Sequence, residues 1–191
     1  PKSEPAFERI LGFYFQRRHD VFSQVNPGQN ERMIEIVRSW LSEFGPETVI
    51  DLYCGSGNFS LFLASGGASV TGLDISRRSI QLARKNAEIN NVSGCTFIQA
   101  DSKAFPVHLT RYRGDAFLLN PPRQGCTAAT MAAVLEHRPH LIVYVSCSPP
   151  TLARDLKSLI AGGYRIRRIQ PLDMFPQTHH VETVVLLSLG T

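Results

Sequence analysis

The sequence lacks any long apolar run. Its 191 residues are 43% hydrophobic and 19% charged, as in ordinary soluble globular proteins. No stretch approaches the roughly 18 apolar residues that a membrane-spanning helix needs, and residues 1–4 show no apolar signal segment. We therefore expect a cytoplasmic domain with one buried core and no membrane partner.

Cysteine is scarce, and its spacing is not that of a metal site. None of the cysteines forms the Cys-x-x-Cys pair that holds zinc or an iron–sulfur cluster. They also do not resemble the disulfide framework of a small secreted domain. The four are Cys54, Cys95, Cys126 and Cys147. His179 and His180 have no acidic or cysteine partner at metal-ligand spacing, so we expect loop residues, reduced thiols and no metal.

A large excess of charge is also missing. The net charge of +4 and the pI near 9.1 lean only weakly toward an anionic partner. The cations form short clusters at residues 17–19, 77–78, 111–113 and 165–168. Each cluster is equally compatible with a solvated basic face, because phosphate binding needs several cations on one surface. The charge is therefore compatible with RNA as a partner and does not require it.

Strand-like and helix-like patterns alternate after the first thirty residues. Helices are predicted at Asn30–Glu43, 57–65, 77–90 and 151–161, and strands at 49–52, 70–74, 96–98, 116–119, 141–145, 164–170 and 183–189. This alternation predicts an α/β, Rossmann-like fold with a mostly parallel seven-stranded sheet and helices on both faces. The unbroken apolar run at 141–145 is typical of a strand buried on both sides.

A glycine turn follows the first predicted strand, at the edge where parallel sheets bind ligands. The turn Gly55-Ser56-Gly57 lacks the third glycine of a dinucleotide fingerprint, because position 60 is Ser60. Asp51, just before the turn, would also repel a pyrophosphate. S-adenosylmethionine has no phosphate and has a sulfonium and an ammonium group, so a carboxylate here suits it by charge.

Two further acids end predicted strands at the same edge. Asp74 stands where a ribose-binding acid is expected and can accept two hydrogen bonds from a diol. Asp101 is placed to reach an adenine amino group. Each acid taken alone is equally explained as a helix cap or turn residue. Their order along the chain, together with Asp51 and the glycine turn, favours a cofactor site.

Cys147 lies where an apolar strand meets the turn at Pro149-Pro150. A free cysteine is usually a small buried residue. Here its position at the ligand edge, before the start of a predicted helix, favours a thiolate. The residues by themselves leave both interpretations open, a structural thiol and a nucleophile.

Four segments resemble the RNA 5-methyluridine (uracil-C5) methyltransferase family. Residues 145–155 look like its nucleophile motif, 51–60 like its cofactor loop, 173–182 like its general-base segment, and 22–26 like its cofactor-contacting N-terminal segment. The resemblance runs from about residue 13 to 189. It implies S-adenosylmethionine-dependent methylation of a uridine in RNA (tRNA or rRNA). It also implies an N-terminal segment at 1–29, a remnant of or link to a preceding domain, and a catalytic domain at 30–191.

The resemblance implies a role for each matching residue. Cys147 would add to C6 of the uracil, and Glu182 would remove the C5 proton so that the thiolate can leave. Pro122 and Arg123 would shape the pocket for the base. The cofactor site would be lined by Gln24, Asp51, Tyr53, Gly55, Gly57, Asn58, Asp74, Asp101 and Asn120.

Departures from the family pattern keep two other functions open. Asn120 stands where the family usually has aspartate, and 120–122 resembles the Asn-Pro-Pro turn of methyltransferases acting on amino groups. Those enzymes follow the turn with an aromatic residue rather than Arg123, and they have no need of Cys147. A non-catalytic cofactor- or RNA-binding domain is disfavoured by the presence of both Cys147 and Glu182. No sequence here accounts for the family's RNA-binding barrel or iron–sulfur cluster, and the oligomeric state stays open.

Overall fold

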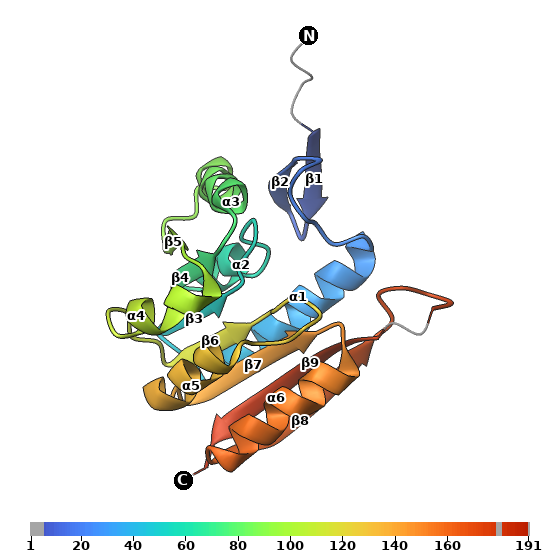
Figure 1. Cartoon of the computed structure of the whole chain (residues 1–191). Helices are drawn as coiled ribbons and strands as arrows, with labels where there is room; N and C mark the ends of the chain where they lie inside the picture. The colour runs from blue at the N-terminus through green and yellow to red at the C-terminus, as the bar shows by residue number, and fades with distance from the viewer. Residues whose placement is uncertain (1–5, 179–180, 191) are drawn as a thin grey trace.

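A seven-stranded sheet forms the centre of the molecule. The computed structural model describes residues 6–178 and 181–190, and the strand order is β5-β4-β3-β6-β7-β9-β8 (Figure 1). The parallel strands are β3 (Thr48–Leu52), β4 (Ser69–Asp74), β5 (Cys95–Gln99), β6 (Ala116–Leu119) and β7 (Leu141–Ser146). β9 (Glu182–Leu189) pairs antiparallel with both β7 and β8 (Tyr164–Leu172). The predicted α/β fold with a mostly parallel sheet is confirmed.

Helices cover both faces of the sheet, as predicted. One face packs against α1 (Pro27–Ser42), α2 (Ser60–Ser65) and α3 (Arg77–Ile89). The other packs against α4 (Phe105–Leu109), α5 (Ala128–His137) and α6 (Pro149–Ala161), with the short 3-10 helix η1 (Ser102–Ala104) before α4. Strand β7 contributes to both cores because successive side chains alternate between faces. Val143 belongs to the first core and Tyr144 to the second.

Several predicted boundaries need correction. The helix predicted at Asn30–Glu43 begins at Pro27 instead. The side chain of Asn26 accepts a hydrogen bond from Gln29 N (3.2 Å), and proline is well suited to the first helical position. The helix predicted from residue 57 begins only at Ser60, because the preceding glycine turn has positive φ. Helices α4 and α5 were not predicted.

The N-terminal segment contains a β-hairpin that the sequence patterns did not predict. β1 (Ala6–Ile10) and β2 (Phe13–Arg17) pair antiparallel around a turn at residues 11–12 with positive φ. Phe13 stacks on Phe62 of α2 at a ring distance of 4.7 Å, and Ile10 and Phe15 join the core beneath α1–α3. The hairpin thus shares a core with the main sheet.

The helices of the described residues are all too short or too polar to cross a membrane.

Candidate functional site

Cys147 and Glu182 lie at the carboxyl edge of the parallel strands. Ser146, the last residue of β7, pairs with Thr183 of β9. Because β9 runs antiparallel to β7, the start of β9 lies at the edge where β7 ends. Glu182 is therefore brought beside Cys147 although 35 positions separate them in the sequence, and the charge of Glu182 acts on the Cys147 thiol.

The loop of Cys147 is held by its neighbours. Ser146 Oγ accepts a hydrogen bond from Ser148 N (3.1 Å) and donates one to Ser148 O (3.2 Å). Ser148 is the N-cap of α6, and Pro149 begins the helix. The half-buried Cys147 thus occupies a short turn between β7 and α6. The residues on either side of it, Ser146 and Ser148, are joined by these hydrogen bonds.

The fold favours the thiol form of Cys147 over the thiolate. Burial raises the pKa of Cys147, and the nearby Glu182 acts in the same direction. A hydrogen bond and the positive charge of Arg123 lower the pKa without overcoming burial. Burial thus acts against the thiolate that the start of the following helix was expected to favour, because burial penalises the charged form.

Glu182 is a buried carboxyl group whose pKa lies near neutral pH. It is 5% exposed, and burial raises its pKa to about 7, with Arg123 acting in the opposite direction. A group with this pKa can take up and release a proton at neutral pH, as a general base requires. Arg123 acts on both Cys147 and Glu182, so the three side chains predicted for the reaction are brought together.

The glycine turn is built around the ends of β3 and β4. Gly55 N donates to Asp74 Oδ2 (3.0 Å), so the acid that ends β4 holds the turn that follows β3. Gly55 and Gly57 have φ of 55° and 86°, values that glycine adopts without strain. A Cβ on Gly57 would lie 2.6 Å from Leu61 Cδ1, so Gly57 also permits close packing against α2.

Asp51 lies beneath the turn and is wholly buried. One carboxylate oxygen accepts from Ser60 Oγ at 2.5 Å, and the other has no hydrogen-bond partner among the described residues. Burial raises its pKa to about 7; the bond from Ser60 lowers the pKa, and the charge of Asp74 raises it. A buried acceptor without a partner is costly, and a nearby cation would relieve that cost.

Other predicted cofactor residues have protein partners. The Asn58 and Asn30 amides exchange two hydrogen bonds of 2.8 and 3.0 Å. Tyr53, at φ 66°, directs its hydroxyl to Thr130 (3.4 Å). Asp101 is exposed and caps η1, accepting from Lys103 N (2.9 Å).

Two of the remaining predicted residues follow β6 of the sheet, and the third, Gln24, precedes α1. Gln24 lies in the segment between β2 and α1, where its carbonyl accepts from Arg17 (3.5 Å). Asn120 follows β6 and donates its backbone N–H to Leu52 O (3.3 Å). Pro122, exposed after it, accepts from Gly125 N (2.8 Å).

The sequence patterns did not single out two buried residues that hold the loops of the site in place. Asn86 of α3 is wholly buried; its amide donates to Ser56 O in the glycine turn (3.1 Å) and accepts from Gln16 N of β2 (2.9 Å). Asp155 of α6 is 4% exposed and has several donors around it. An asparagine inside a helix and an acid on the apolar side of a helix are both unfavourable unless they are paired. Polar residues at such positions were the signal by which the sequence could have revealed Asn86 and Asp155.

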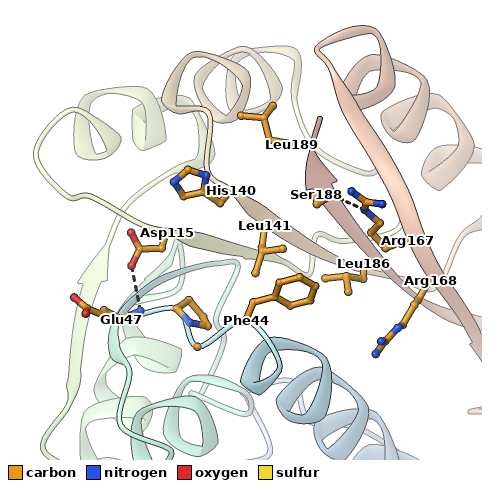
Figure 2. Close-up of a pocket in the computed structure, with 12 residues that line it drawn as sticks. Phe44, Glu47, Asp115, His140, Leu141, Arg167, Arg168, Leu186, Ser188 and Leu189 are labelled. Carbon is orange, nitrogen blue, oxygen red and sulfur yellow. Dashed lines mark hydrogen bonds between the residues drawn. The ribbon is translucent and has the colours of Figure 1, made fainter. Parts of the chain in front are cut away.

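The described residues contain no group of histidine, cysteine and acidic side chains that could hold a metal, and His179 and His180 lie outside those residues. A cavity of about 740 Å³ opens at the opposite, amino edge of the parallel strands. Figure 2 shows His140 and Asp115 on one side of it and Arg167 with Ser188 on the other. None of the predicted site residues lines this cavity.

The architecture is that of S-adenosylmethionine-dependent methyltransferases. A putative methyltransferase of this class from Streptococcus mutans has the same fold, with a TM-score of 0.72 and 16% identity. That likeness covers 96% of this chain and 55% of the other. It defines the class of fold and leaves the reaction open.

Sequence then identifies the family. The chain belongs to the tRNA (uracil-5-)-methyltransferase family, which it matches over residues 9–189. It is 43% identical to an uncharacterised RNA methyltransferase of Thermosynechococcus vestitus, over 95% of this chain and 40% of the relative. The tRNA (uracil-54, C5)-methyltransferase of Pyrococcus abyssi, solved with S-adenosyl-L-homocysteine, has a TM-score of 0.87 at 36% identity, covering 96% of this chain and 44% of that one. The chain thus spans about two fifths of these relatives.

Proposed function

We propose that this chain is the methyl-transferring part of an S-adenosylmethionine-dependent RNA methyltransferase that acts on C5 of a uridine through a covalent Cys147–C6 adduct. The observation that carries the proposal is the meeting of Cys147, Glu182 and Arg123 at one edge of the sheet. A thiol and a carboxyl group with a pKa of about 7 are the two groups that this reaction needs.

The residues around the glycine turn fit S-adenosylmethionine. The unpartnered oxygen of the buried Asp51 favours a cationic ligand above the turn. A Cβ added at Gly55 would meet no heavy atom within 4 Å, so the space beside this glycine is open to a ligand. Asp74 and Asp101 would hold the ribose and the adenine, with Gln24, Tyr53, Asn58 and Asn120 completing the site. When bound, the cofactor supplies the electrophilic methyl group.

The chain's own residues would carry the uracil through addition and elimination. Cys147 gives up its thiol proton to solvent, and the thiolate forms a bond to C6, which places negative charge on the ring and makes C5 nucleophilic. Arg123 favours the thiolate by its charge, and Pro122 beside it bounds the pocket. After C5 is methylated, the Glu182 carboxylate accepts the C5 proton, and the electron pair of that C–H bond expels the thiolate. A stacked uridine must first turn out of its helix to reach this edge.

The substrate class follows from the relatives. They are named RNA methyltransferases, and the Pyrococcus abyssi enzyme is named for a tRNA uridine. We infer a tRNA or rRNA substrate in the cytoplasm. Residues 30–191 would be the catalytic domain, and 1–29 a remnant of or link to a preceding domain, whose hairpin packs on the catalytic core. Because those proteins are more than twice as long, we expect segments outside this chain to contribute to RNA choice.

Trapping the adduct tests the proposal. The chain is mixed with S-adenosylmethionine and tRNA or rRNA transcripts that contain 5-fluorouridine. Fluorine cannot leave C5 as a cation, so the adduct should persist and map to Cys147 by mass spectrometry, and Cys147→Ala should form none. Methyl transfer to an amino nitrogen that survives in Cys147→Ala, with no adduct in the unaltered chain, would overturn the proposal.

A further inference from the structure

Asp155 is a buried acid whose two carboxylate oxygens are both engaged. Oδ2 accepts from the Tyr144 hydroxyl (2.5 Å) and from Cys126 N (2.8 Å). Oδ1 accepts a hydrogen bond from Arg154 Nε (2.9 Å) and forms an ion pair with the same guanidinium, whose Nη2 lies 2.8 Å away. A buried carboxylate is expensive unless it is paired, and here it joins β7, α6 and the chain before α5.

The first two turns of α6 hold the loop of Arg123 by its main chain. Thr151 Oγ1 lies 3.0 Å from Arg123 O and 3.1 Å from Ser148 O, so its one proton is shared between the loop carbonyl and the N-cap carbonyl. Arg154 Nη2 donates to Gln124 O at 2.8 Å and to Cys126 O at 3.3 Å. Together with the bond from Cys126 N to Asp155, these contacts fasten successive peptide groups of the loop. They form what we call the α6 clamp: Thr151, Arg154 and Asp155.

The loop fits the clamp closely. Gly125 has a φ of 75°, and a Cβ there would lie 2.5 Å from Arg154 Nη2 and 2.6 Å from Asp155 Oδ2. Gly125 N also donates to Pro122 O (2.8 Å), which closes the turn around Arg123. Any side chain at position 125 would therefore push the loop away from α6.

The same helix begins immediately after Cys147. Its N-cap is Ser148, and its first residue is Pro149, so α6 follows β7 directly (Figure 1). One rigid helix therefore holds the nucleophile loop at its start and the Arg123 loop along its next turn. The charged side chains that act on Cys147 are Arg123, from that loop, and Glu182, from β9.

We propose that Asp155, acting through Arg154 and the main chain of residues 123–126, is a positioning residue that sets Arg123 beside the Cys147 thiol. Asp155 would not touch the uridine. Its meaning for catalysis rests on the proposed function, whereas its effect on the thiol is measured without RNA or cofactor.

The experiment measures the rate at which iodoacetamide alkylates Cys147, from pH 7 to pH 10, on the 191-residue chain. Mass spectrometry of the Cys147 peptide separates this thiol from the other three. Between pH 8 and pH 10 Glu182 is largely ionised, so changes in the profile there report on Arg123. Asp155→Asn is compared with Thr151→Val, which removes the hydroxyl shared between Arg123 O and Ser148 O, and with Leu109→Ala, a core change in α4 outside the clamp.

Asp155→Asn should move the alkylation profile to higher pH and slow the reaction at pH 8 by about 3- to 10-fold, because less thiolate forms. Thr151→Val should shift it in the same direction by less. The direction of the shift is informative, because removing the negative charge of Asp155 without moving Arg123 would lower the pKa of Cys147 and move the profile to lower pH. Leu109→Ala should lower the melting temperature and leave the profile unchanged.

A profile that stays in place or moves to lower pH in folded Asp155→Asn would overturn the proposal. If that variant does not fold, an unshifted profile in Thr151→Val overturns it equally. The proposed function is tested separately, by the 5-fluorouridine adduct. If no adduct forms but the alkylation profile shifts, the proposed function is lost and the positioning of Arg123 by Asp155 stands. With an adduct and an unshifted profile, only the role of Asp155 is lost.

Discussion

The two halves of the candidate site are held together by different chemistry. In the cofactor half, at the ends of β3 and β4, neutral amides bond Asn86 to Ser56 O and Asn58 to Asn30, beside the bond from Gly55 N to the Asp74 carboxylate. In the reaction half, at the ends of β6 and β7, an ion pair between the buried Asp155 and the exposed Arg154 makes such bonds. Both halves occupy one edge of one sheet, so the contrast comes from the side chains and not from the fold.

The contrast bears on how each half responds to pH. Amide hydrogen bonds do not titrate in the range where proteins are folded. The reaction half contains Glu182, with a pKa of about 7, and Cys147, whose pKa is raised by burial. Asp51 is the exception in the cofactor half, because burial raises its pKa to about 7 as well.

The largest effect should come from the nucleophile. Cys147→Ala should reduce methyl transfer to RNA by at least about 1,000-fold, because no covalent route to a nucleophilic C5 remains. Binding of S-adenosylmethionine, measured by calorimetry, should be unchanged, since Cys147 belongs to the reaction half. A variant that loses cofactor binding as well would break the division into two halves.

The next effect separates addition from elimination. Glu182→Gln should slow turnover by about 100-fold or more, because an amide cannot accept the C5 proton. The Cys147 adduct should then accumulate with ordinary uridine RNA, visible as a covalent complex in a denaturing gel. In the unaltered chain the rate should rise with pH through about 7, as Glu182 becomes ionised. A rate that falls over this range would exclude Glu182 as the base.

Asp51 should make stability depend on pH. Its folded pKa of about 7 lies above the ordinary 3.8, so its contribution to stability is full below pH 4 and is lost as pH rises through 7. The difference corresponds to roughly 4 kcal/mol. Chemical denaturation at pH 5 and pH 8 should show Asp51→Asn lacking most of this decline. An equal decline in the variant would assign it to other groups.

The smallest effect should come from Asn86. Asn86→Ala removes the donor to Ser56 O together with the acceptor of Gln16 N. It should weaken S-adenosylmethionine binding by about 10-fold, in line with the one buried hydrogen bond lost to the glycine turn. Asn90→Ala is the matched control: Asn90 is the C-cap of α3, and its amide bonds to the main chain of Tyr14 in the hairpin without touching the glycine turn. Equal losses of affinity in both variants would trace the effect to the hairpin.

Much of the fold was predictable because the signals are local. The strand at 116–119 was predicted with the bounds of β6, and β7 exceeds its prediction by one residue. The hairpin was not predicted, because Phe13 and Phe15 find their partner, Phe62, far along the chain. The roles of the site residues stay predictions; their arrangement was only partly foreseeable, since Asn58 turned out to pair with Asn30.

The sequence by itself determined the order of apolar strands, the glycine turn, the family and the place of Cys147 at the end of a strand. These depend on neighbours in the chain, whose spacing sets the backbone conformation and the hydrophobic pattern. Only the tertiary structure decided that Glu182 meets Cys147, because the antiparallel β9 lies beside β7. The tertiary structure also decided the pKa of Glu182 and the hydrogen bonds between α6 and the Arg123 loop. Burial and pairing depend on groups that are distant in sequence.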